Sequence, residues 1–79
     1  MPSPLYTEVV RIVTSFVGAE KGPGIVERQL KFAPGATADT FSKEHLQKIQ
    51  GMLVTASKLY LADPSKFETL KSQVAAKAV

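Results

Sequence analysis

Apolar residues at three- and four-residue spacing dominate the chain, and the first such run begins directly after Ser3-Pro4. A serine followed by a proline is typical of a helix start, because the serine caps free backbone N–H groups and proline fits the first helical position. Gly18 supplies a stop. The pattern therefore predicts a helix over residues 4–17, with apolar positions at Leu5, Val9, Ile12, Val13 and Phe16.

A second helix is predicted over residues 23–32. It starts at Pro23 and carries Ile25, Val26 and Leu30. It ends before Pro34, because a residue that precedes proline is pushed out of the α region. An earlier start, near Ala19, is the alternative.

Two further helices are predicted over residues 43–61 and 64–77. Ser42 can cap the third helix, and Phe41 and Leu46 occupy the two positions of a hydrophobic staple. Asp63-Pro64 repeats the cap-plus-proline pattern for the fourth helix.

Four helices, short loops and no alternating strand pattern predict an all-α fold, a compact bundle of four helices. We expect residues 1–79 to form a single helical domain with a core that contains Phe16, Leu30, Ile49, Leu53, Phe67 and Leu70.

The chain has 79 residues and no cysteine. This length is near the lower limit for a self-sufficient core, so association with a second chain is a natural supplement. The lack of cysteine is typical of a reducing compartment, and we expect a cytoplasmic protein. Residues 5–17 are too short to span a bilayer and are interrupted by Glu8 and Arg11, which argues against a membrane helix or a signal peptide.

The segment GAEKGPGIVERQL, residues 18–30, raises the question of a phosphate-binding loop. Such a loop needs a preceding strand and free N–H groups at a helix start. Here a helix precedes the loop, and Pro23 removes one donor. We interpret the segment as a connection between two helices.

Candidate catalytic and metal-binding groups form no pattern that predicts an enzyme. His45 has Lys48 and Ile49 at helical spacing, so it lacks a second ligand, and we interpret it as a solvent-facing or cap-side histidine. The carboxylates lie mostly at helix starts or on polar faces. We expect no catalytic residue, no metal site and no cofactor.

The net charge of +3 allows a nucleic-acid-binding domain as an alternative, with Lys21, Arg28 and Lys31 as its basic patch. A helix-turn-helix interpretation is disfavoured, because the connection of about nine residues before the third helix exceeds the three or four that the motif requires. The third helix is also rich in apolar side chains where base-reading residues would be needed.

The apolar arcs of the first and third helices favour a protein interface. They span roughly 160 and roughly 220 degrees, whereas a helix on the edge of a core needs only about 100. The third helix is therefore either central in the bundle or shared with a second chain. We predict helix-mediated protein association, most simply a homodimer, with interface residues Tyr6, Val10, Met52, Val54 and Leu61.

A family resemblance points in the same direction. The segments that carry it are Phe16-Val17-Gly18, the Gly22-Pro23 pair, VERQL at residues 26–30 and SKEHLQKI at residues 42–49. The chain resembles small helical domains appended to bacterial signalling proteins, such as response-regulator, kinase and Roadblock-type chains. The resemblance implies a non-catalytic, cytoplasmic interaction module and carries over no functional residue.

Overall fold

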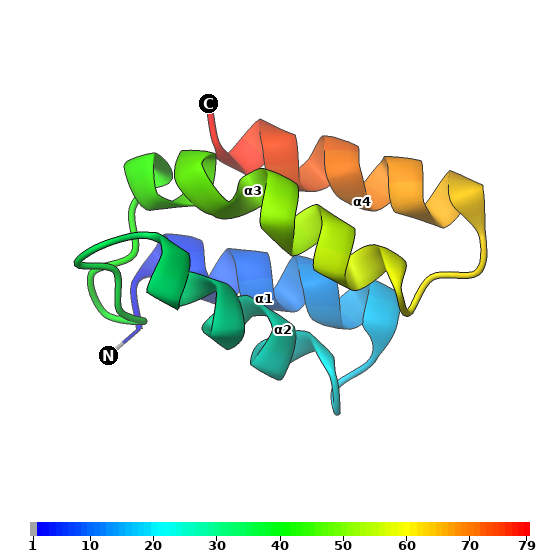
Figure 1. Ribbon diagram of the computed structural model, residues 1–79, viewed down its shortest axis with the longest axis horizontal. Helices are drawn as coiled ribbons and strands as arrows, with labels where there is room; N and C mark the ends of the chain where they lie inside the picture. The colour runs from blue at the N-terminus through cyan, green and yellow to red at the C-terminus, as the bar shows by residue number, and fades with distance from the viewer. Residues whose placement is uncertain (1) are drawn as a thin grey trace.

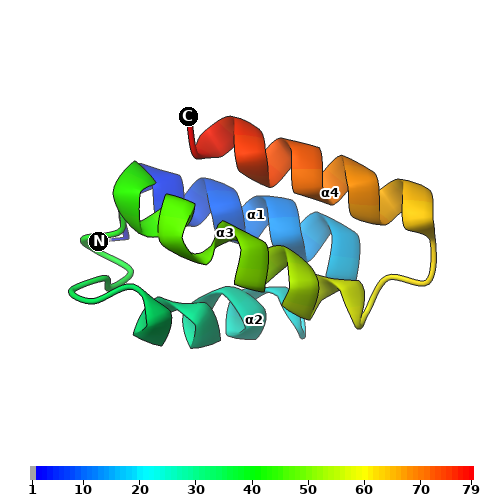
Figure 2. The ribbon, with the colours of Figure 1, turned by 45° about the horizontal axis from the view of Figure 1, so that its top comes forward.

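The computed structural model describes residues 2–79, and this part of the chain forms four α-helices and one short 3-10 helix. They are α1 (Pro4–Val17), α2 (Gly22–Gln29), η1 (Leu30–Phe32), α3 (Lys43–Lys58) and α4 (Pro64–Lys77). Successive α-helices run in opposite directions, and α2 and α4 lie on opposite sides of the pair formed by α1 and α3 (Figures 1 and 2). The predicted all-α bundle of four helices is confirmed.

The bounds of α1 and α4 agree with the prediction. The Ser3 hydroxyl accepts a hydrogen bond from the Tyr6 N–H at 3.1 Å, and the Asp63 carboxylate accepts one from the Ser65 N–H at 2.9 Å. Gly18 ends α1 with a φ of 101°, a conformation that favours glycine. These three ends follow directly from cap chemistry.

The other two helices are shorter than predicted. α2 begins at Gly22 and ends at Gln29, and its last turn tightens into η1 before the extended residue Ala33. α3 ends at Lys58 and not at residue 61. After Lys58, tight turns replace the helical hydrogen bonds: the Tyr60 N–H donates to the Ser57 carbonyl, and the Leu61 N–H donates to the Lys58 carbonyl. The chain must become extended at Asp63, which caps the next helix, so the last turn of α3 opens early.

The core is one cluster of buried side chains to which all four α-helices contribute. The predicted core residues Ile49, Leu53 and Leu70 are fully buried, whereas Phe16, Leu30 and Phe67 are half-buried and pack against the cluster. Phe41 and Leu46, the predicted staple pair, are both buried. In residues 2–79 no helix combines the length and the apolar character that crossing a bilayer requires.

The long connection between η1 and α3 is held in place by hydrogen bonds. Ser3 N–H donates to the Ala38 carbonyl at 2.8 Å, which ties the connection to the start of α1. Within it, Thr37 and Thr40 exchange backbone-to-hydroxyl hydrogen bonds at 2.9 and 3.1 Å. These hydrogen bonds hold the connection against the start of α1 and stabilise its turn.

Candidate functional site

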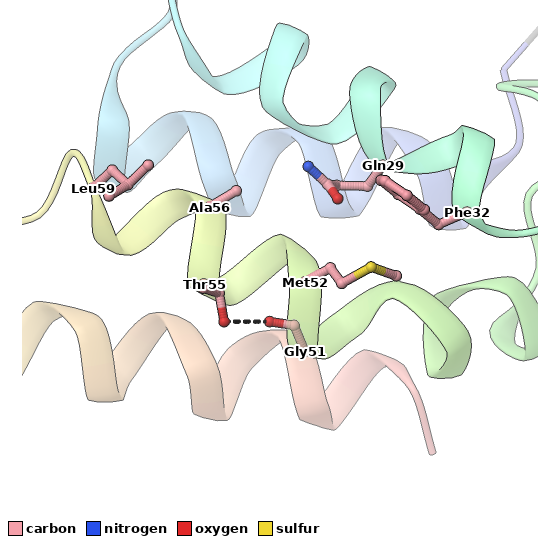
Figure 3. A pocket seen from close by; sticks show the side chains of 7 residues that line it. All are labelled: Gln29, Phe32, Gly51, Met52, Thr55, Ala56 and Leu59. Atoms are coloured by element: carbon pink, nitrogen blue, oxygen red, sulfur yellow. Dashed lines mark hydrogen bonds between the residues drawn. The ribbon is translucent and has the colours of Figure 1, made fainter.

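Large apolar side chains are exposed on η1, on α3 and directly after the end of α3, where these elements border one another. Phe32 is 49%, Met52 38% and Leu59 84% exposed. They lie on a groove of about 420 Å³, which we call the α2–α3 groove; its lining residues are Gln29, Phe32, Gly51, Met52, Thr55, Ala56 and Leu59 (Figure 3). Exposed apolar side chains gathered in one place are typical of an interaction surface.

The α3 wall of this groove follows from helical spacing. Met52 and Leu59 are seven residues apart, which is about two helical turns, so they lie on the same stripe of the helix. The small residues Thr55 and Ala56 lie between them, so the side chains in the middle of the stripe project less than those at its two ends. Leu59 still has helical angles, φ −61° and ψ −21°, so it continues this stripe one residue beyond α3.

The opposite wall comes from α2 and η1. Figure 3 shows Gln29 and Phe32 on the side of these elements that faces α3. Phe32 is the last residue of η1, and Ala33 is extended, with φ −119° and ψ 97°, ahead of Pro34. The chain therefore leaves the helical conformation of η1 directly after Phe32, and the Phe32 ring still lines the groove.

The groove has few polar groups that need a partner. The Thr55 hydroxyl donates to the Gly51 carbonyl of its own helix at 2.8 Å, so its one donor is already used (Figure 3). Lys31 Nζ lies 5.2 Å from the centre of the Phe32 ring, within cation–π range. The surface thus combines an apolar floor with a positive charge at its Phe32 end.

A second groove, the α3–α4 groove, has a volume of about 460 Å³, and its lining residues are Gln50, Gly51, Val54, Thr55, Phe67, Lys71 and Ala75. Its largest apolar group, Phe67, is half-buried against the core, and the centre of its ring lies 5.3 Å from Lys58 Nζ. Because its rim carries Gln50 and Lys71, this groove is the more polar of the two and the weaker candidate.

The five predicted interface residues lie in different environments. Met52 lines the α2–α3 groove, while Tyr6, Val10 and Leu61 are half-buried against the core. Val54 is only 7% exposed and packs inside the chain, so its side chain is already covered. The predicted interface remains a prediction, but Val54 does not offer an exposed side chain to it.

The sequence reasoning missed Phe32 and Leu59 as surface candidates. Leu59 belonged to the broad apolar arc of the third helix, so the signal was present, but a helical wheel does not tell which part of an arc other helices cover. Phe32 gave no such signal, because its exposure depends on the tight turn of η1.

Tyr6 is held by contacts within the chain. Its ring packs edge-to-face on Phe41, with 5.8 Å between ring centroids. Burial of the phenol, with a smaller contribution from the negative charge of Glu27, raises the pKa of Tyr6 above its ordinary value.

The remaining candidates are structural or isolated. His45 Nδ1 accepts a hydrogen bond from the Ser42 N–H at 3.2 Å, so this histidine caps α3, as expected from its position. In the described residues, no three His, Asp or Glu side chains gather as a metal site would require. The glycine-rich segment turns the chain between α1 and α2, and Lys21, Arg28 and Lys31 are all exposed.

Comparison of this chain with protein-family models, with curated proteins and with solved structures finds no match.

Proposed function

We propose that this chain is a non-catalytic helical module that binds another protein chain through the α2–α3 groove. The observation that carries the proposal is the exposure of Phe32, Met52 and Leu59 around one apolar groove. Burying such side chains against a partner removes apolar surface from water, at about 25 cal/mol per Å². The resemblance to domains appended to bacterial signalling proteins is consistent with a role in regulation.

Site-specific photo-crosslinking in living cells tests this proposal. Met52 is replaced by a photoreactive phenylalanine analogue, and Val79, which is equally apolar in character and 83% exposed, is replaced in a control strain. We expect protein adducts from position 52 that are absent from position 79. Equal labelling at the two positions, or no adduct at position 52, would contradict a binding role of the groove.

Nucleic-acid binding is the second candidate, favoured by the exposure of Lys21, Arg28 and Lys31 along α2 and η1. Their spacing of seven and three residues puts them on one side of a helical segment. Fluorescence anisotropy with duplex and single-stranded DNA at low salt tests this candidate, with the triple variant Lys21→Gln, Arg28→Gln, Lys31→Gln as the control. Absence of binding by the wild type, or equal binding by the variant, would exclude the patch as a nucleic-acid site.

A further inference from the structure

The arrangement of side chains along α3 matches a second copy of the same chain. We infer that two copies associate through their α2–α3 grooves, with the two α3 helices antiparallel and the two-fold axis passing between Thr55 and Ala56. This inference rests on the proposed function and specifies the partner.

The first argument is the symmetry of the apolar stripe. In a two-fold dimer, each residue opposes the one at the same distance on the other side of the axis. Met52 and Leu59 are equally far from the midpoint between Thr55 and Ala56, so Met52 of each copy would face Leu59 of the other. The small pair Thr55 and Ala56 would lie at the crossing, where helices approach most closely.

The second argument is the match between a projecting side chain and a receiving groove. Leu59 is 84% exposed, so most of its side chain is available to a partner. The groove beside Met52 and Phe32 is apolar and holds about 420 Å³. Each copy therefore provides both a projecting leucine and an apolar groove for the leucine of the other copy.

The third argument is charge complementarity along the same axis. Lys48 lies four residues before Met52, about one helical turn further along the same stripe, and it is exposed. The antiparallel arrangement directs Lys48 of one copy toward the C-terminal end of the partner's α3, where the backbone carbonyls carry partial negative charge. Lys31, beside Phe32, would be close to the same end of the partner's α3.

Sedimentation equilibrium of the wild-type chain, from about 1 μM to about 1 mM, tests the association itself. We expect a reversible dimer with a Kd on the order of 10 μM, because an interface of this kind is small. Leu59→Glu should raise the Kd at least about 100-fold, because it introduces a charge into each of two symmetric contacts. Val79→Glu is the matched control, with an equally exposed apolar side chain and the same charge change.

A monomer over the whole concentration range overturns the inference. So does a dimer that Leu59→Glu leaves intact, or one that Val79→Glu weakens to the same degree. Thermal unfolding of both variants at low concentration should match the wild type, because neither side chain belongs to the core.

Disulfide cross-linking tests the register, since the chain has no cysteine of its own. Chains with Met52→Cys and chains with Leu59→Cys are mixed and oxidised, and we expect the disulfide between the two different variants to dominate. Two cysteines that both stand at position 52 would be about 10 Å apart along the helix axes, which is beyond the reach of a disulfide. Predominance of disulfides between two chains that carry the same substitution overturns the proposed axis.

The photo-crosslinking experiment separates this inference from the proposed function. Adducts at position 52 with twice the mass of the chain support both. Adducts only with a different protein leave the binding function standing and overturn the dimer.

Discussion

The hydroxyl of Thr14 on α1 is buried without a hydrogen-bond partner within the described residues. It faces Gly22, the first residue of α2. A buried polar group that lacks a partner reduces stability by about 1–3 kcal/mol. Thr14→Val keeps the shape of the side chain and removes the hydroxyl, so we expect the free energy of unfolding to rise by about 1 kcal/mol in urea titrations. A loss of stability would show that the hydroxyl forms a hydrogen bond, for example with water.

Gly22 allows α1 and α2 to approach closely. A Cβ added at Gly22 would lie 2.6 Å from the Cα of Thr14, so the backbone of one helix would have to move. We expect Gly22→Ala to lower the free energy of unfolding by about 2 kcal/mol. Gly24→Ala in the same helix is the matched control, because its Cβ would meet only Arg28 Nη2, at 3.9 Å. The control should stabilise by about 0.5–1 kcal/mol through helix propensity, and equal effects at the two positions would contradict the steric argument.

Tyr6 makes the free energy of unfolding depend on pH in the alkaline range. Its pKa is raised in the folded chain by burial and by Glu27, so folding favours the neutral phenol. The stability that Tyr6 contributes in this way is fully present below 10.0, the pKa of tyrosine in the unfolded chain. It is lost as the pH rises through the higher pKa of Tyr6 in the folded chain. We expect Tyr6→Phe to lose less stability than the wild type between about pH 9.5 and 11. Urea titrations of the two chains across this range measure the difference, and equal losses would contradict the role of Tyr6.

At the level of the helices, the sequence predicted the ends that side chains determine and missed the ends that tertiary packing determines. Ser3, Gly18 and Asp63 act locally, so their effects can be read from neighbouring residues. The end of α3 has no comparable signal: no glycine follows Lys58, and the helix stops because the chain must turn into α4. Such a stop depends on the path that the chain takes into the next helix, which the periodicity of apolar residues does not report.

The position of α3 explains why it carries so much apolar surface. It packs on α2, η1 and α4 and also contacts α1, so packing within the chain covers part of its apolar arc. Leu53 is fully buried in it. We expect Leu53→Ala to lower the free energy of unfolding by about 2–5 kcal/mol, because it leaves a cavity. Val79→Ala, at an exposed site, should stay within about 0.5 kcal/mol of the wild type, and a near-neutral Leu53→Ala would contradict the packing of α3.

Central packing does not account for Met52 and Leu59, which remain exposed although α3 has neighbours on several sides. The sequence predicted that α3 has more apolar surface than one stripe requires. It did not locate the surplus, because Val54 lies on the arc as well and is covered by packing within the chain. Only the three-dimensional arrangement separates the covered part of the arc from the exposed part.

For the whole molecule, self-association predicts that thermal stability depends on protein concentration. A dimer that forms only from folded chains draws the equilibrium toward the folded state by mass action. When the dimer dominates, each tenfold rise in concentration adds about 0.7 kcal/mol of stability per chain. For a domain of this size, that corresponds to a rise in Tm of about 3–5 °C.

Scanning calorimetry from about 10 μM to about 1 mM measures this slope. We expect the wild type and Val79→Glu to show the rise in Tm, and Leu59→Glu to show a much smaller rise or none. The difference in Tm between the wild type and Leu59→Glu should narrow toward the lowest concentration, because a smaller share of the wild-type chains is dimeric there. A Tm that is independent of concentration for the wild type, or that rises equally for Leu59→Glu, would show that the α2–α3 groove is not covered by a second copy.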